Sequence, residues 1–80
     1  MKAKVYVTLK SAVLDPQGKA IERSLHRLGY QEVKNVRMGK YIQLNLNETD
    51  QNRASKRLEE MCKKLLSNPV IEDIRYEFTE

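Results

Sequence analysis

The chain has 80 residues, enough for one domain that buries about 60–65% of the surface its unfolded form exposes. Its 15 Lys and Arg and 11 Asp and Glu give a net charge of +4 at pH 7, with acidic residues interspersed among the basic ones. This pattern differs from the clustered basic patch of a typical nucleic-acid-binding protein. No apolar run approaches the ~20 residues of a membrane span, and we expect no signal peptide at the N-terminus.

Cysteine and histidine content narrows the ways in which so small a domain can be stabilised. Cys62 and His26 are the only residues of their kinds, so no intrachain disulfide can form and no metal-ligand spacing is present. Small domains gain stability from disulfides, metals or oligomerisation. We therefore expect that this domain gains stability from oligomerisation. A lone thiol without an export signal favours a cytoplasmic location.

Two elements are predicted in the first part of the chain. Residues 4–10 alternate between apolar and polar side chains, which predicts a half-buried strand with Tyr6 and Thr8 on its polar face. Asp15 is a natural N-cap, and apolar residues recur after it at every third or fourth position, which predicts an amphipathic helix. Gly29 follows the last of them and is expected to end the helix in the left-handed conformation.

Four elements are predicted in the rest of the chain. Strands are expected at residues 33–38 and 41–46, joined by a tight hairpin at Gly39-Lys40. Residues 47–50 supply caps and negative charge for the start of a second amphipathic helix, whose apolar positions run from Ala54 to Leu65. A last strand is expected over 71–78. The fold class is therefore α+β, a ferredoxin-like split βαβ of order β-α-β-β-α-β, with an antiparallel sheet and both helices on one face.

The uncovered face of such a sheet needs an explanation in a domain of this size. We expect that it makes the self-association, through Tyr6, Thr8, Tyr41 and Gln43. The alternative is an RNA-binding module of the RNA-recognition-motif type, in which Tyr6 and Tyr41 would stack on bases. Residues 37–44 match the consensus of such modules poorly.

The segment Leu14-Asp15-Pro16-Gln17-Gly18 combines a helix start with an unexplained glycine. Pro16 pre-sets the first helical turn, and the Asp15 carboxylate caps it and discourages a bound anion. Gly18 costs about 1 kcal/mol relative to Ala inside a helix, which indicates that another backbone or a partner surface comes close.

Catalytic chemistry is poorly supported. The chain offers no Ser/His/Asp or Cys/His arrangement and no glycine-rich phosphate loop, and Cys62 lies on an apolar helix stripe. We therefore expect no catalytic, cofactor-binding or metal-binding residue.

Five segments together resemble the PurS family, the small subunits of phosphoribosylformylglycinamidine (FGAM) synthase, and the resemblance covers nearly the whole chain. These segments are Lys4–Lys10, Val13–Ile21, Leu28–Tyr30, Val36–Ile42 and Cys62–Asp73. The most specific are the blocks Leu-Asp-Pro-Gln-Gly at 14–18 and Asn-Pro-Val-Ile-Glu-Asp at 68–73. One departure is visible, because Ser11-Ala12 stands where the family usually has a glycine before Val13.

The resemblance implies one PurS-like domain over residues 1–80 that is an accessory subunit of this glutamine-dependent carbon–nitrogen ligase of purine synthesis. The complex converts formylglycinamide ribonucleotide, glutamine and ATP to the amidine. Such a subunit is a homodimer or a dimer of dimers. It bridges a PurQ-like glutaminase and a PurL-like synthetase, and ATP and Mg bind to the synthetase, not to this chain.

Two regions are expected to contact partner subunits. One is the corner formed by Asp15, Pro16, Gln17 and Gly18, and the other is the predicted hairpin with Arg37, Gly39 and Lys40. Local capping explains the corner equally well, and a solvated turn is the alternative for the hairpin. If the corner is a contact, replacing Gly18 by Val should leave folding near normal and impair glutamine-dependent activity.

Overall fold

The computed structural model describes residues 1–79 and has a three-stranded antiparallel sheet at its centre. The strands are β1 (Lys2–Leu9), β2 (Gly39–Asn45) and β3 (Glu72–Thr79), in the order β2-β1-β3. The helices are α1 (Pro16–Arg27) and α2 (Gln51–Met61), and a π-helical turn, η1 (Cys62–Leu66), continues α2. The α+β class and the antiparallel sheet are confirmed.

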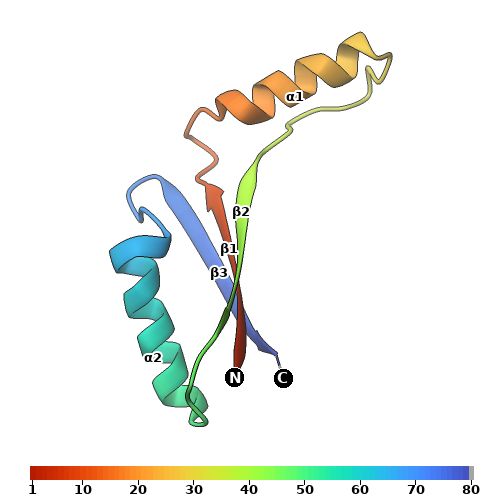
Figure 1. Cartoon of the computed structure of the whole chain (residues 1–80). Helices are drawn as coiled ribbons and strands as arrows, with labels where there is room; N and C mark the ends of the chain where they lie inside the picture. The colour runs from red at the N-terminus through yellow and green to blue at the C-terminus, as the bar shows by residue number, and fades with distance from the viewer. Residues whose placement is uncertain (80) are drawn as a thin grey trace.

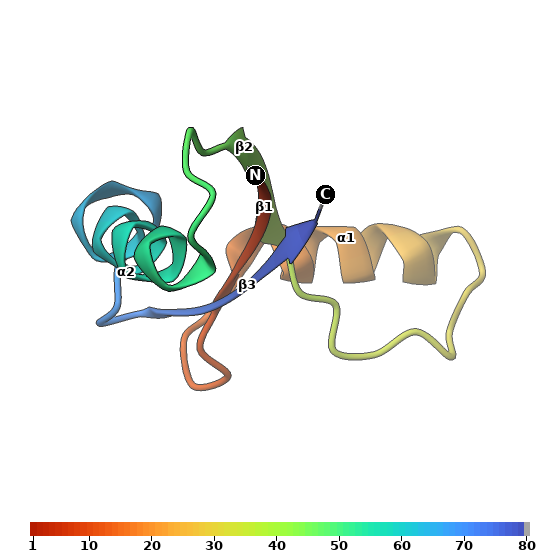
Figure 2. The same ribbon diagram turned by 90° about the horizontal axis from the view of Figure 1, so that it is seen from below.

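The core lies between the sheet and α2. Alternation along β1 turns Ala3, Val5 and Val7 to this side, where they are buried against Leu58 and Cys62. Fully burying a Val or Leu side chain contributes about 1.5–3 kcal/mol, and partly buried residues such as Leu44, Met61 and Phe78 pack against this cluster. Figures 1 and 2 show α2 lying along this one face of the sheet.

The ends of α2 follow the expected chemistry. Asp50 is its N-cap, and the carboxylate accepts a hydrogen bond from the Asn52 amide at 2.9 Å. After η1 the Ser67 amide donates to the Cys62 carbonyl at 2.9 Å, and Pro69 follows shortly. None of the helices in residues 1–79 combines the length and hydrophobicity needed to cross a membrane.

The helix α1 lies beyond the end of the sheet where β1 ends and β2 begins (Figure 1). It belongs to an arm, residues 10–38, and only Gly18 of α1 is buried. The molecule therefore measures 49 × 27 × 14 Å, with a radius of gyration of 16.0 Å. A compact domain of this length has a radius of about 12 Å. The expectation that both helices cover one face is corrected, because α2 alone does so.

The predicted strand at 33–38 is also wrong. These residues, which we call the strap, form an extended segment beside α1 without strand pairing, and Asn35 adopts a positive φ of 57° within it. Gly39 and Lys40 do not make a hairpin but begin β2. The sheet keeps the order of a ferredoxin-like sheet but lacks the strand that would lie beside β2.

Candidate interaction sites

Asp15 joins the start of α1 to the start of β2. Its side chain is 3% exposed and accepts hydrogen bonds from the Gly18 amide at 2.9 Å and the Met38 amide at 2.7 Å. The first bond is the predicted N-cap, with Pro16 at the first helical position. These two amides hold the pKa of the Asp15 carboxyl below its usual value. Asp15 therefore ties together two segments 23 residues apart.

Arg37 makes the complementary connection. Its Nη2 atom donates to the carbonyls of Lys10 and Val13, each at 2.9 Å. The guanidinium thus holds the loop before α1 to the strap after it. We call Asp15, Arg37 and the backbone groups that they bind the clasp. The clasp cross-links the two connections between the arm and the sheet.

Two further side chains of α1 bind the strap. Glu22 accepts from the Val36 amide at 3.1 Å, and the His26 ring Nε2 lies 2.7 Å from the Val33 carbonyl, to which it donates. The Val36 amide lowers the pKa of the Glu22 carboxyl. Positions 15, 22 and 26 fall on one side of a helix. Three backbone groups of the strap, the Val33 carbonyl and the Val36 and Met38 amides, are therefore bound by side chains of α1 and its N-cap instead of a neighbouring strand.

Gly18 has a local reason to be a glycine. A Cβ atom at this position would lie 2.2 Å from the Val36 carbonyl oxygen and 2.9 Å from Asp15 Oδ2. The predicted close approach of another backbone is confirmed. The expectation that a Gly18→Val variant folds nearly normally is wrong, because a side chain here overlaps the strap.

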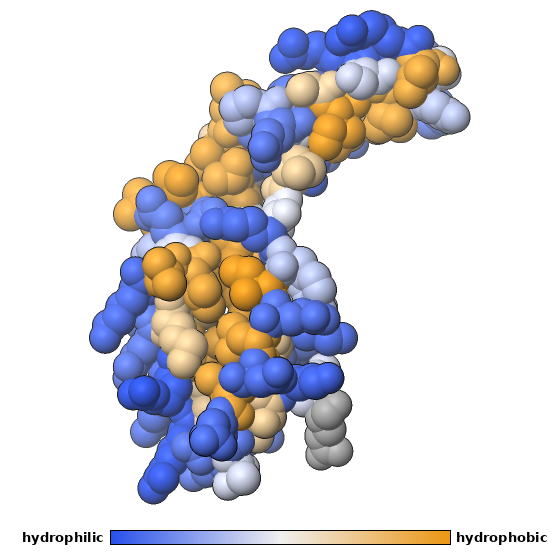
Figure 3. Space-filling model, viewed as in Figure 1, coloured by the Kyte–Doolittle hydropathy of each residue, from blue (hydrophilic) through white to orange (hydrophobic). Residues whose placement is uncertain are grey.

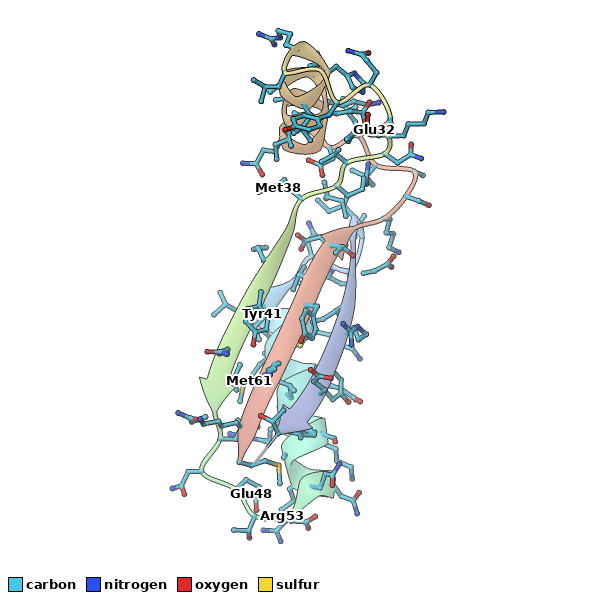
Figure 4. All side chains as sticks on the ribbon, turned by 90° about the vertical axis from the view of Figure 1, so that its right-hand side faces the viewer. Glu32, Met38, Tyr41, Glu48, Arg53 and Met61 are labelled. Carbon is cyan, nitrogen blue, oxygen red and sulfur yellow. The ribbon has the colours of Figure 1, made fainter. Side chains whose placement is uncertain are left out.

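The open face of the sheet, opposite α2, carries an aromatic and charged cluster. Tyr6 and Tyr41 are directly opposite in the β1–β2 register, with ring centroids 5.2 Å apart and planes at 28°. Arg75 on β3 places its guanidinium carbon 4.2 Å from the Tyr6 ring centroid. The Tyr6 hydroxyl donates to Glu77 at 3.0 Å, and this hydrogen bond raises the pKa of Tyr6. Figure 4 looks onto this face, with Tyr41 labelled and α2 behind the sheet.

The four residues predicted for self-association share this open face. Gln43 donates to the Tyr41 hydroxyl at 2.8 Å, and Thr8 is exposed beside them. Tyr6 lies between neighbours from both flanking strands, so both sides of its ring are covered. This leaves it poorly placed for base stacking. Tyr41 remains 51% exposed.

The two regions predicted to contact partner subunits meet around one shallow depression. Asp15 and Gln17 line it from the arm, and Gly39 and Lys40 line it from β2. Pro16 and Gln17 are exposed on the first turn of α1. Asp15 and Arg37 are already bound to backbone groups of the clasp. A partner would therefore contact the exposed residues around the depression, which are Pro16, Gln17 and Lys40.

Sequence reasoning missed two exposed apolar surfaces. One is a stripe on α1 with Ile21 37% and Leu28 74% exposed. The other is a groove between α2 and β2, which Figure 3 shows as a hydrophobic area in the body of the molecule. The groove is lined by Leu44, Leu46, Met61, Leu65 and Leu66 among others. The apolar period of α1 is the sequence signal for the first surface. It predicts that one side of the helix is buried, and the expected fold places that side on the chain's own sheet.

Within residues 1–79 no group of three or more His, Cys, Asp or Glu side chains could hold a metal ion. Cys62 is buried, and burial raises the pKa of its thiol, which makes it a poor nucleophile.

Comparison with known proteins identifies the family. The model of the PurS family, described as phosphoribosylformylglycinamidine (FGAM) synthase, matches residues 2–80. The chain belongs to the PurS family. It is 52% identical over 79 residues to the FGAM synthase subunit PurS of Bacillus subtilis, which covers 99% of this chain and 93% of that protein.

Solved PurS structures share the architecture. A B. subtilis PurS crystal structure superposes with a TM-score of 0.89 and 52% identity, over 99% of this chain and 98% of that one. Because nearly the whole chain superposes, the displaced arm is common to both. A chain of the PurLQS structure from Thermotoga maritima matches with a TM-score of 0.86 and 34% identity, over 95% of this chain and 93% of that one. These comparisons give no support to the RNA-binding alternative.

Proposed function

We propose that this chain is the non-catalytic subunit of FGAM synthase that links a glutaminase and an ATP-dependent synthetase in purine biosynthesis. The observation that carries the proposal is the PurS family match over residues 2–80, together with the likeness to a chain of PurLQS. ATP and Mg would bind to the synthetase. The chain would act as one domain in the cytoplasm.

Self-association is the first part of the proposal. The arm exposes an apolar stripe that the clasp keeps away from the sheet, and the body exposes an apolar groove beside α2. Two copies that exchange arms would cover both surfaces, as in domain-swapped dimers. The open face with Tyr6, Thr8, Tyr41 and Gln43 offers a second and more polar surface. Two different surfaces are what a dimer of dimers requires.

Contact with the other subunits is the second part. The depression between the corner and the start of β2 combines exposed polar groups, from Gln17 and Lys40, with apolar lining from Leu9 and Met38. Polar and apolar groups at one concave place suit a transient or mixed protein interface. We propose that Asp15–Gly18 and Arg37–Lys40 form this contact, with Asp15, Gly18 and Arg37 shaping it from below.

The mechanism follows from holding two active sites together. Ammonia released by a glutaminase is useful only if it reaches the synthetase before it is protonated or diffuses away. A small subunit that binds both enzymes raises the local concentration of ammonia without any chemistry of its own. A rigid projecting arm suits this role because it sets the distance between the surfaces that it connects.

Reconstitution of the complex tests the proposal. We expect that omitting this chain abolishes most glutamine-dependent turnover, because that route needs the assembled complex. Turnover with added ammonia should change much less. Equal dependence of the two rates on the chain would contradict a bridging role, and salt-sensitive binding of the chain to single-stranded RNA would favour the alternative.

A further inference from the structure

The net charge of the molecule is concentrated in the arm. Residues 10–38 contain six Lys and Arg and three Asp and Glu, a net charge of +3 out of the +4 of the whole chain. The other 51 residues carry nine basic and eight acidic side chains, a net charge of +1. The body is therefore close to neutral, and the arm is the cationic part of the molecule.

Two of the three acidic residues of the arm accept hydrogen bonds from backbone amides of the arm. Asp15 accepts from the Gly18 and Met38 amides, and Glu22 accepts from the Val36 amide. Both carboxylates are turned toward the strap, although Glu22 also attracts Lys19 of α1. The exposed charge of the arm is thus more positive than its composition alone suggests.

Three basic side chains form a row along the outer side of α1. Lys19, Arg23 and Arg27 are four residues apart, so they lie on one side of the helix, and all three are exposed. At 1.5 Å per residue the row is about 12 Å long. None of the three makes an ion pair within the described residues 1–79. We call these residues the cationic row.

The cationic row lies on the opposite side of α1 from the apolar stripe. Successive residues of a helix turn by about 100°, which places Arg23 nearly opposite Ile21 and Leu28. Figure 3 shows this division, with hydrophilic residues along the upper edge of the arm and hydrophobic ones on its underside. A partner that covers the stripe leaves the cationic row facing outward.

Local folding explains only Arg27 of the cationic row, because this residue lies in the last turn of α1, where the helix dipole favours a cation. Like charges four residues apart repel each other, and Lys19 lies near the helix N-terminus, where the dipole disfavours a cation. The basic residues of α2 are different, because Glu59 and Glu60 are interspersed with them and Arg53 lies 4.0 Å from Asp50. A row of exposed cations that makes no ion pair within residues 1–79 is typical of a surface that meets an opposite charge.

We infer that the cationic row docks on an acidic surface of a partner subunit of the synthase. This inference rests on the proposed function, which supplies the partner subunits. Its occupant is a protein surface with carboxylates spaced along about two helical turns. The row would speed association by electrostatic attraction and fix the orientation of the arm, while the depression at the clasp supplies shorter-range contacts.

Charge reversal tests the inference. The double variant Arg23→Glu and Arg27→Glu changes the charge of the row, and Arg53→Glu with Lys56→Glu makes the same change on the exposed side of α2. Binding to the purified synthetase and glutaminase subunits is measured at 50, 150 and 300 mM salt. Sedimentation and thermal unfolding of the chain alone report self-association and folding.

For the unmodified chain we expect affinity that falls steeply with salt. At 150 mM the row variant should bind roughly tenfold or more weakly, and the α2 variant should lose less than about threefold. The mass and the unfolding midpoint of the row variant should be unchanged.

Equal losses in both variants would show that only net charge matters and would overturn the inference, as would full affinity of the row variant. A lower mass of the row variant would assign the row to self-association. RNA binding that the row variant loses would assign it to a nucleic acid. If the unmodified chain binds neither subunit, the proposed function itself fails.

Discussion

Gly18→Ala should destabilise the protein, although Ala is the better helix former. The new Cβ would lie 2.2 Å from the Val36 carbonyl oxygen, whereas ordinary contact begins at 3.4 Å. The strap would have to retreat by about 1.2 Å, the difference between these two distances. Overpacking of this kind costs about 1–3 kcal/mol, and the gain in helix propensity returns about 1 kcal/mol. Movement of the strap also disturbs the hydrogen bonds that Asp15 and Glu22 make to it.

The middle values give a net loss of about 1 kcal/mol from overpacking and propensity, and the weakened hydrogen bonds add about 1 kcal/mol. The free energy of unfolding should therefore fall by about 2 kcal/mol, which lowers the unfolding midpoint of an 80-residue domain by about 8–16 °C. Circular dichroism at one fixed protein concentration measures this, because self-association adds to apparent stability. Ala20→Gly in the same helix is the control and should cost only the propensity term, about 1 kcal/mol. A higher midpoint for Gly18→Ala would refute the reasoning, since it would show propensity acting without a nearby strap.

Two other predictions concern the carboxylates and the open face. The pKa values of Asp15 and Glu22 are lowered in the folded state from the ordinary values of 3.8 and 4.5. Their contribution to stability is therefore present above these ordinary pKa values and is lost as pH falls through the lower pKa values of the folded state. The double variant Asp15→Asn and Glu22→Gln should therefore be less stable at pH 7 and show a flatter decline below about pH 4 in urea unfolding; a pH profile parallel to that of the unmodified chain would contradict this. Tyr41→Glu should lower the mass in sedimentation equilibrium, because it removes the ring stacked on Tyr6 and adds a charge to the open face. Lys56→Glu on α2 is the control, and an unchanged mass for Tyr41→Glu would remove the open face from self-association.

Sequence patterns correctly predicted β1 and α2, whose apolar sides are buried against each other in the core of this chain. The alternation of Val5 and Val7 places β1 against α2, and the apolar period that runs through α2 into η1 buries Leu58 and Cys62 on the other side of that contact. Helix caps were predictable for the same reason, since Asp15 and Asp50 bind amides within three residues of themselves. Both the apolar period and the helix cap can be recognised from a short stretch of sequence.

The strap could not be predicted in this way. Residues 33–38 have the composition of a strand, but their amides are bound by Asp15 and Glu22, which stand 14 to 23 residues earlier. The apolar stripe of α1 was ambiguous for a related reason. An apolar period shows that a helix face will be buried, but it does not show whether the same chain or another chain buries it.

Gly18 connects the local structure of α1 to a contact with a distant segment, the strap. Its cost in a helix is understandable only when the strap is in place, because the carbonyl that excludes a side chain belongs to Val36. The same glycine lets α1 and the strap approach closely enough for Asp15 to reach the Met38 amide. With Arg37 holding the preceding loop, both connections to the sheet are then bound to each other. We expect these cross-links at the base of the arm to hold its angle to the sheet. The stripe, the cationic row and the groove on the body thus stay at fixed positions relative to one another, which is the property that a subunit linking other chains needs.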